Sequence, residues 1–323
     1  AVALDAFIRP EQALDVARAI TQIFRDQQGL RESRDRARIK YLFMKEGWTA
    51  ESFLAEVERR LGYVLEPGAD EVLPRDVMRD HVGIHRQKQP GLSYVGASVL
   101  RGRLSGDQLA AAAELAERFG DGQLRTSIMQ NLLFINIPNH KTGELARELE
   151  GIGLRVESSP FWRGAIACTG TEFCKLAISE TKSFTRWLVE ELEGRLPGFD
   201  QDLKLHVTGC PNSCGQHWIA DIGLEGKKIK HEGRMVDAFY FCVGGGVGQH
   251  AAIARPVGYR IPATEVPSAL ERLLTSYLDE RIQGEDLQSW FSRYNAEEIR
   301  ARLAGEVLDP VERDVAAMAL DGD

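Results

Sequence analysis

Apolar residues recur every three or four positions through the first sixty residues, and this spacing predicts amphipathic helices. The first helix is expected to begin at Pro10, which suits the first helical position, and to end near Gly29. A second helix is predicted for RESRDRARIKYLFMKEG and a third for TAESFLAEVERRLG, where Thr49 is the expected N-cap. The residues with helical spacing in the first run are Ala13, Leu14, Ala17, Ile20, Ile23 and Phe24.

Between residues 64 and 90 the pattern becomes irregular and rich in proline and glycine, which predicts a loop at a domain boundary. The following residues predict a strand in GLSYVGASVLRGRLS and a helix in GDQLAAAAELAERFG. Two strands, or one bent strand, are predicted for QLRTSIMQNLLFINIP, and another helix for KTGELARELEGIG. This order of strand, helix, strand, strand and helix is typical of a two-layer α+β unit of the ferredoxin-like kind.

From residue 162 onward the pattern predicts a strand, a cysteine-containing loop, a helix to about residue 194, and the strand LKLHV. A second cysteine loop follows, then the strands IADIGLEG and VDAFYFCVGG and two terminal helices. Both cysteine pairs are therefore expected just past strand ends, where loops often carry function. We divide this α+β chain into a helical tail with a linker (1–80), a ferredoxin-like half-domain (81–158), a mixed α/β domain (159–305) and a C-terminal tail (306–323).

The two ends of the chain share a sequence pattern. The N-terminal segment RPEQALDVARAITQIFRDQ resembles the C-terminal segment EVPSALERLLTSYLDER. Likewise, the N-terminal FMKEGWTAESFLAEVERRLG resembles the C-terminal FSRYNAEEIRARLAG. Such self-similarity indicates an internal repeat, unless two amphipathic helix pairs match by chance. We therefore expect the tail of one repeat followed by one complete repeat, with a first half missing upstream.

Composition and charge limit the function classes. The 323 residues are 43% hydrophobic and 27% charged, as in ordinary globular domains. The formal net charge of −8 argues against nucleic acid as the partner, because phosphates require a basic surface. No apolar stretch has the length of a membrane helix, and the opening AVALDAFIRP lacks the features of a signal peptide. We therefore expect a cytoplasmic protein without a membrane partner.

Four of the five cysteines form two close pairs, in ACTGTEFCKLA and TGCPNSCG, and such pairs are typical of metal or redox sites. Four thiolates from two loops can hold a [4Fe-4S] cluster. Structural zinc usually has two to four residues between paired ligands, so the five residues between Cys168 and Cys174 fit zinc poorly. Zinc, and two buried pairs or disulfides, remain alternatives. Cys242, in the apolar run AFYFCVGG, is expected to be a core thiol.

The motif CTGTEFCKLAISETK, together with TGCPNSCGQHWIADIGL, resembles the paired cysteine motifs of the siroheme-containing nitrite and sulfite reductases. The resemblance covers nearly the whole chain. It includes RTSIMQN in the ferredoxin-like half-domain and implies a siroheme and [4Fe-4S]-binding domain over residues 159–305. That family is built as an internal twofold repeat, so residues 1–62 would be the tail of its first half.

The resemblance implies a role for each paired cysteine. Cys168, Cys174, Cys210 and Cys214 would hold a [4Fe-4S] cluster. Cys214 would also bridge the cluster to the siroheme iron as its axial ligand, which makes it the expected catalytic residue. A shared thiolate couples an electron-storing cluster to the metal that holds substrate, as a six-electron reduction requires. The basic residues over the substrate face would lie mostly in the first half.

The same resemblance proposes four side chains for siroheme contact: Arg125, Gln130, Asn131 and Asn212. The alternative is that these strand-end and turn residues satisfy local backbone groups. The glycine-rich GGGVG at 244–248 could bring its N–H groups to a siroheme carboxylate, or it could be a plain turn. His206 and His217 flank the second cysteine pair and could relay protons or be structural.

The sequence CPNSCGQ favours nitrite as the substrate, because the flavoprotein-partnered sulfite enzymes more often read CPNGCGR. The resemblance therefore implies six-electron reduction of nitrite to ammonia by electrons from an external one-electron donor such as ferredoxin. Three alternatives stay open. They are assimilatory reduction of sulfite to sulfide, a precorrin-3B synthase-like oxygenase, and an incomplete half that acts only as an iron–sulfur module.

Overall fold

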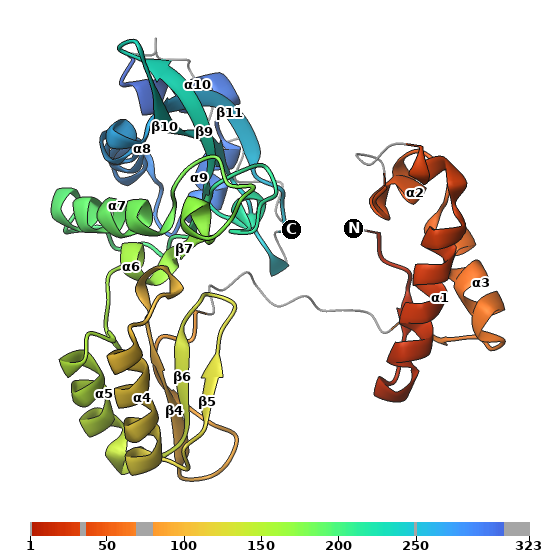
Figure 1. The fold of residues 1–323 in the computed structure, drawn as a ribbon, viewed down its shortest axis with the longest axis horizontal. Helices are drawn as coiled ribbons and strands as arrows, with labels where there is room; N and C mark the ends of the chain where they lie inside the picture. The colour runs from red at the N-terminus through yellow and green to blue at the C-terminus, as the bar shows by residue number, and fades with distance from the viewer. Residues whose placement is uncertain (1, 33–36, 69–79, 249–250, 307–323) are drawn as a thin grey trace. The chain divides into compact units, whose positions relative to one another are not determined.

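The computed structural model describes residues 2–32, 37–68, 80–248 and 251–306, which fall into two compact units (Figure 1). The first unit contains residues 2–68 and the second contains residues 80–306. The C-terminal tail expected at 306–323 lies outside the described residues, except for Glu306. Within the described ranges, no helix combines the length and the apolar character needed to cross a membrane.

The first unit is a small helical body with a short two-stranded sheet. Strand β1 (Ala6–Phe7) pairs antiparallel with β2 (Glu66–Pro67). The helices are α1 (Ala13–Asp26), α2 (Lys40–Met44) and α3 (Ala50–Leu61). The predicted N-cap is confirmed, because the Thr49 hydroxyl accepts a hydrogen bond from the Ser52 amide. The predicted second helix is much shorter than expected, and residues 33–36 of that run lie outside the described residues.

The buried face of α1 overlaps only in part with the expected stripe of apolar residues. Val16, Ala19 and Ile23 are buried against α3 and its flanking residues, whereas Leu14 is 70% exposed. The helical spacing predicted an apolar stripe correctly, but the sequence alone did not show which edge of that stripe faces the core.

The second unit begins with a four-stranded antiparallel sheet in the order β3-β4-β6-β5. Its strands are β3 (Gly83–Arg86), β4 (Leu92–Ala97), β5 (Leu124–Thr126) and β6 (Leu132–Pro138). Helices α4 (Gly106–Phe119) and α5 (Thr142–Gly151) cover one face of this sheet (Figure 1). The predicted ferredoxin-like α+β order is confirmed. Strand β3 was not predicted, because its residues fall in the stretch that was expected to be a loop.

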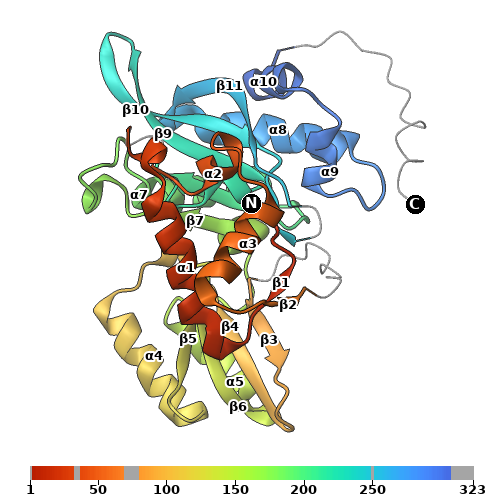
Figure 2. The ribbon, with the colours of Figure 1, turned by 90° about the vertical axis from the view of Figure 1, so that its right-hand side faces the viewer.

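A five-stranded mixed sheet follows, in the order β11-β10-β9-β8-β7. Strands β7, β8 and β9 are parallel, whereas β9, β10 and β11 are antiparallel. The bounds are β7 (Ala165–Ala167), β8 (Leu205–Thr208), β9 (Ile222–His231), β10 (Arg234–Val243) and β11 (Arg255–Pro262). Strands β9 and β10 form a long hairpin (Figure 2). Strand β11 is absent from the sequence-based prediction.

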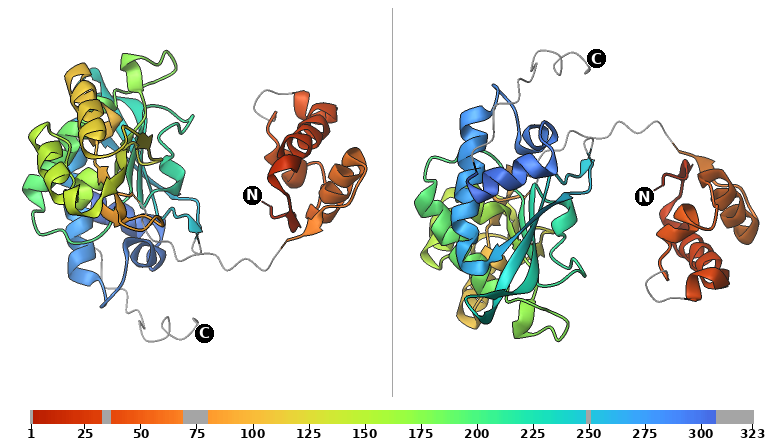
Figure 3. Two further views of the ribbon diagram at one scale, coloured as in Figure 1. Left: turned by 90° about the horizontal axis from the view of Figure 1, so that it is seen from below. Right: turned by 90° about the horizontal axis from the view of Figure 1, so that it is seen from above.

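The helices of this part pack on the five-stranded sheet. They are α6 (Pro160–Gly164), α7 (Lys182–Arg195), α8 (Val266–Glu280), α9 (Leu287–Ser292) and α10 (Ala296–Ala304). Three helices therefore follow β11 in the described residues, where two were expected. Helix α10 lies beside strand β11 and packs against helix α8 (Figure 3).

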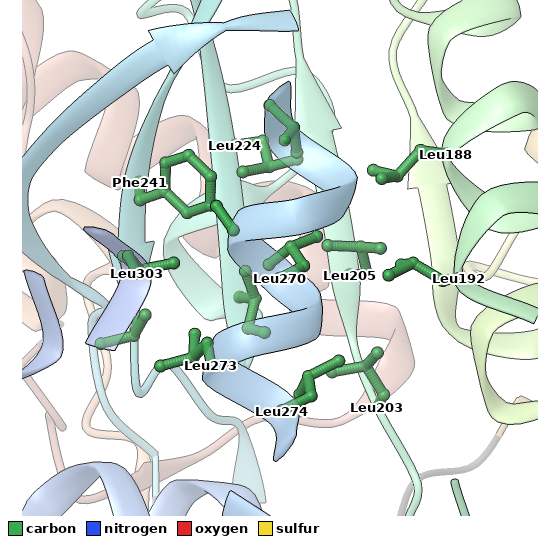
Figure 4. Packing of buried hydrophobic residues seen from close by; sticks show 14 of the residues in the cluster. Leu188, Leu192, Leu203, Leu205, Leu224, Phe241, Leu270, Leu273, Leu274 and Leu303 are labelled. Atoms are coloured by element: carbon green, nitrogen blue, oxygen red, sulfur yellow. The ribbon is translucent and has the colours of Figure 1, made fainter. Parts of the chain in front are cut away.

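The main core lies between the five-stranded sheet and helices α7 and α8. Leu270 of α8 points toward Leu205 of β8, Leu192 of α7 approaches from the side, and Leu274 lies beside Leu203 (Figure 4). Each fully buried leucine contributes about 2 kcal/mol of apolar burial. Helix α7 forms the crossover between the parallel strands β7 and β8, so both strands end at the same edge of the sheet.

Candidate metal centre

The two cysteine loops begin at the carboxyl ends of neighbouring parallel strands. Cys168 directly follows β7, and Cys210 lies two residues past β8. The Cys168 amide donates to the Val207 carbonyl at 3.0 Å, which extends the β7–β8 ladder by one residue. The Gly209 amide then donates to the Cys168 sulfur at 3.1 Å. The sheet therefore brings the start of both loops into direct contact, as the predicted strand ends implied.

Two glycines allow this close contact. Gly170 has a positive φ of 69°, and a Cβ there would lie 2.5 Å from the Thr181 hydroxyl oxygen. A Cβ at Gly215 would lie 2.5 Å from the Val207 carbonyl oxygen. A larger residue would collide with Thr181 at the first position and with strand β8 at the second, so close packing requires glycine in both motifs.

The four paired cysteines are all free thiols with different exposures. Cys168 and Cys174 are half-buried, Cys210 is buried and Cys214 is exposed. In the described part of the chain, no three His, Cys, Asp or Glu side chains are gathered closely enough to hold one metal ion. A four-iron cluster differs from a single ion because each thiolate binds a separate iron. The donor set fits such a cluster in chemistry, and the N–H directed at the Cys168 sulfur is a contact that cluster ligands use.

Three side chains from two segments hold the backbone at the first cysteine. Gln130 donates to the Ala167 carbonyl at 3.0 Å and accepts from the Ala167 amide at 3.4 Å. The Lys182 ammonium also donates to the Ala167 carbonyl, at 2.8 Å, and to the Arg101 carbonyl. The Thr181 hydroxyl donates to the Cys168 carbonyl at 2.7 Å. The position of Cys168 is thus fixed by the ferredoxin-like half as well as by helix α7.

Lys182 is a buried cation that the sequence analysis did not single out. Burial lowers the pKa of its ammonium, and the neighbouring Arg103 lowers it further. A sequence signal did exist, because Lys182 lies on the same helical face as the buried Val189 and Leu192. A charged residue on an apolar helical stripe indicates a specific buried partner, which here is a pair of backbone carbonyls.

The four side chains expected at siroheme lie in two different environments. The Gln130 side chain donates a hydrogen bond to the Ala167 carbonyl. The buried Asn131 side chain accepts a hydrogen bond from the Val99 amide at 3.0 Å. Arg125, at the middle of β5, and Asn212, between Cys210 and Cys214, are both exposed. The structure therefore places two of these side chains in internal hydrogen bonds and two at the surface.

Arg103 links the ferredoxin-like half to the first cysteine loop. Its guanidinium forms an ion pair with Glu172 at 2.7 Å and lies 5.6 Å from the centre of the Phe173 ring. Glu172 and Phe173 stand between Cys168 and Cys174. The sequence analysis missed this contact because no local pattern relates residue 103 to residue 172.

The GGGVG turn directs its first amides inward. The amides of Gly244, Gly245 and Gly246 donate to the carbonyls of Asp221, Ala220 and Ala252. A Cβ at Gly245 would lie 2.7 Å from the Ala220 carbonyl oxygen. These contacts match the plain-turn interpretation, because the three N–H groups are used within the protein.

His206 is buried beside the second cysteine loop, and this burial lowers its pKa to about 4. Its Nδ1 lies 3.1 Å from the Gln216 carbonyl oxygen. Since the unfolded chain has a His pKa of 6.5, the unfolded state takes up the proton first as pH falls. The stability that a neutral His206 supplies is therefore complete above pH 6.5 and is lost as pH falls toward 4.

We expect the free energy of unfolding of the second unit to fall by about 3 kcal/mol between pH 6.5 and pH 4 through His206 alone. His206→Asn keeps a donor for the Gln216 carbonyl but cannot titrate in this range. Urea unfolding, monitored by tryptophan fluorescence at several pH values, would measure the free energy of unfolding of the wild type and of the variant. Equal pH slopes for the wild type and the variant would contradict the expectation.

Two family models match the chain. The Nitrite/Sulfite reductase ferredoxin-like half domain matches residues 85–152. The Nitrite and sulphite reductase 4Fe-4S domain matches residues 1–65 and 158–309. The second model therefore matches segments from both ends of the chain, on either side of the ferredoxin-like match.

Named relatives include enzymes for both candidate substrates. The chain is 36% identical over 305 residues to sulfite reductase (ferredoxin) 1 of Mycolicibacterium paratuberculosis, covering 92% of this chain and 54% of that protein. It is 34% identical over 275 residues to ferredoxin–nitrite reductase of Synechococcus elongatus, covering 85% of this chain and 53% of that protein. The chain thus spans about half the length of the curated relatives it matches.

A solved structure shares the fold. The Mycobacterium tuberculosis NirA protein matches with a TM-score of 0.84 and 32% sequence identity. The match covers 92% of this chain and 55% of that one.

Proposed function

The chain belongs to the nitrite and sulfite reductase family, and from this premise we propose that it carries the siroheme and [4Fe-4S] centre of a ferredoxin-dependent nitrite reductase. The reaction converts nitrite, six electrons and eight protons into ammonium and two waters. The complete activity is part of the proposal, because the relatives that carry it are about twice as long.

One observation carries this proposal. Two loops that bear four free thiols meet at the ends of adjacent parallel strands, and the Gly209 amide donates to the Cys168 sulfur. Cys168, Cys174, Cys210 and Cys214 would hold the cluster, and the exposed Cys214 would share its thiolate with the siroheme iron. When bound, the two cofactors supply electron storage and a metal that binds the substrate.

The protein's own contribution is to hold the thiolates in place. The backbone of Cys168 is held by the strand ladder and by Thr181, which limits how far its sulfur can move when the charge of the site changes. The Gly209 amide donates to that sulfur and favours added negative charge there. The buried Lys182 adds a positive charge nearby with the same effect.

The residues near the proposed siroheme edge would act in two ways. Gln130 and Asn131 would hold the backbone that faces the macrocycle, since both side chains already bind backbone groups. Arg125 and Asn212 would contact the cofactor directly, since both side chains are exposed. A cationic arginine suits the carboxylates that siroheme carries.

The choice of substrate rests on the second cysteine motif and the named relatives. CPNSCGQ favours nitrite, and relatives named for nitrite reduction match at 33–38% identity. Relatives named for sulfite reduction match equally well, which keeps sulfite as the second candidate. Comparing kcat/KM for nitrite and sulfite on the same preparation would decide between them, and a preference for sulfite would overturn the nitrite assignment.

We also propose that residues 1–62 are the tail of a first half of the same fold. Helices α3 and α10 have matching ends, with capping boxes at Thr49 and Asn295 and left-handed C-caps at Gly62 and Gly305. Helices α1 and α8 are each preceded by a single 3-10 turn. The 4Fe-4S domain model also matches both ends of the chain. These likenesses support the repeat that the sequence suggested.

The proposed donor is ferredoxin, which the names of the relatives include. We place the protein in the cytoplasm because all five cysteines are free thiols, as a reducing compartment would keep them.

The first test is an anaerobic absorption spectrum of the purified chain, with iron, sulfide and zinc assayed on the same sample. Siroheme bands with about four cluster irons and one macrocycle iron would support the proposal. A cluster spectrum without the macrocycle would indicate an isolated iron–sulfur module. Zinc without sulfide would overturn the cluster assignment, and oxygen-dependent turnover of a corrinoid precursor would point to the oxygenase.

Cys242 is expected to be unnecessary for cofactor binding. Its thiol is buried, and burial raises its pKa to about 12, so it stays protonated and is a poor metal ligand. Cys242→Ala should therefore leave iron and sulfide content unchanged, at a stability cost of about 1 kcal/mol. Loss of iron in this variant would show that the ligand set is wrongly assigned.

A further inference from the structure

A line of four polar side chains runs from the protein surface to the second cysteine loop. Ser213 stands between Cys210 and Cys214, and its hydroxyl lies 2.9 Å from Nδ1 of His217. Nε2 of His217 lies 3.3 Å from Oε2 of Glu225 on strand β9. The other oxygen of Glu225 lies 2.5 Å from the Lys227 ammonium. None of these contacts involves a proposed ligand of the cluster or the siroheme.

The two central groups are buried, so their contacts decide how they behave. The side chain of His217 is 1% exposed and that of Glu225 is 9% exposed, while Lys227 reaches solvent at 35%. A buried carboxylate is costly unless it is paired. Contact with His217, and then with Lys227, lowers the pKa of Glu225, so this group is a carboxylate. The surface lysine therefore makes a buried negative charge tolerable beneath the cysteine loop.

The Glu225 carboxylate also sets the hydrogen-bonding role of His217. The negative charge of the carboxylate lies 3.3 Å from Nε2, outside hydrogen-bond geometry, and favours the tautomer that carries its proton on that nitrogen. Nδ1 is then an acceptor, and the Ser213 hydroxyl donates to it. The backbone of His217 packs closely on strand β9, because a Cβ at Gly223 would lie only 2.3 Å from the His217 carbonyl oxygen. His217 thus presents an acceptor to the cysteine loop from a closely packed backbone.

Ser213 needs such an anchor because its backbone is strained. Its φ is 58°, in the left-handed region that residues other than glycine seldom adopt. Gln216, three residues on, has a φ of 57°. The turn that separates the two cysteines is therefore held in a conformation that its local sequence does not favour. A side-chain hydrogen bond at Ser213 offsets part of that strain.

We propose that His217 is a positioning residue for the second cysteine pair, which acts by holding the Ser213 hydroxyl and is itself oriented by the Glu225–Lys227 ion pair. The order of contacts gives each member a different task. Lys227 stabilises the carboxylate, the carboxylate selects the tautomer, and the imidazole fixes the loop on which Cys210 and Cys214 are presented. The assignment concerns the protein alone and goes beyond the choice of substrate.

The buried Cys210 thiol reports on the loop. In the full chain, reduced and freed of metal with a chelator, alkylation of Cys210 by N-ethylmaleimide requires the loop to open. Peptide mass spectrometry follows Cys210 and, as an internal reference, Cys174 on the other loop. Because this readout needs no cofactor, it stands even if the cofactor or substrate proposal fails.

Two substitutions at His217 separate positioning from packing. His217→Asn keeps an amide near the position of Nδ1 and so retains a partner for Ser213, whereas His217→Gln places its amide near the position of Nε2. We expect His217→Gln and Ser213→Ala to raise the alkylation rate of Cys210 roughly tenfold, as loss of one buried hydrogen bond implies. His217→Asn should stay within about twofold of the wild type. Glu225→Gln should raise the rate in the same direction.

Matched controls make the outcome decisive. His231→Gln, on the same strand β9, changes an exposed histidine that lies 3.8 Å from Glu265 and should leave Cys210 protected. Circular dichroism would check that every variant is folded. Equal rates for His217→Asn and His217→Gln would reduce His217 to a packing residue and overturn the proposal. Unchanged protection of Cys210 in both His217→Gln and Ser213→Ala would overturn it as well.

Discussion

Replacing Cys214 by serine is expected to reduce nitrite turnover to the background of the assay. Cys214 is the exposed member of the four paired cysteines, and it is the one that we propose shares its sulfur with a second metal. A serine hydroxyl stays protonated near neutral pH and is a far weaker ligand than a thiolate. The measurement is turnover with reduced ferredoxin and with a chemical one-electron donor, alongside the absorption spectrum.

Two other cysteine variants make this result specific. Cys174→Ser removes a proposed cluster ligand on the other loop and should lower iron and sulfide content directly. Cys242→Ala removes a buried thiol and should preserve both content and turnover. Near-normal turnover in Cys214→Ser, with the cofactors bound, would refute the shared-ligand role.

The sequence predicted the placement of the cysteine loops because that placement depends on local signals. Short apolar runs such as LKLHV, followed by glycine and cysteine, mark strand ends, and the structure confirms strands β7 and β8 there. The N-cap at Thr49 was predictable for the same reason, since a cap is a relation between residues three positions apart.

Strand β11 was missed because its sequence resembles a loop. RPVGYRIP contains two prolines and a glycine, which weaken any strand signal. The strand is nevertheless possible because it lies at the edge of the sheet, where one side of its backbone needs no ladder partner. Strand β3, also at a sheet edge, was missed in a similar stretch between Pro74 and Pro90.

The support of the candidate site could not be predicted, because its contacts join residues far apart in sequence. Gln130 binds the backbone of Ala167, and Lys182 binds the carbonyl of Arg101. Neither pair leaves a periodic pattern that a single sequence could reveal. The sequence therefore proposed the cysteines as ligands, whereas the groups that hold their loops were found only in the fold.

Asp80→Ala is expected to lower the free energy of unfolding of the second unit by about 2–3 kcal/mol. The side chain of Asp80 is 3% exposed and accepts two hydrogen bonds from Arg163, at 2.6 and 2.9 Å. It also accepts from the Val82 amide at 3.0 Å. Removing it leaves a partly buried guanidinium and a buried amide without this acceptor. The expected loss of stability is smaller than for a fully buried ion pair, because the side chain of Arg163 is 34% exposed.

Asp200→Ala is the matched control for this effect. Asp200 forms the same two-bond pair with Arg281, at 2.8 and 3.1 Å, but its side chain is 57% exposed. Its removal should change stability by less than about 1 kcal/mol. Urea unfolding of both variants would measure the difference. If both variants lose the same free energy of unfolding, burial does not explain how much the Asp80–Arg163 pair contributes to stability. A large loss of stability in Asp80→Ala alone would show that the Asp80–Arg163 ion pair anchors helix α6. That helix leads through strand β7 to Cys168.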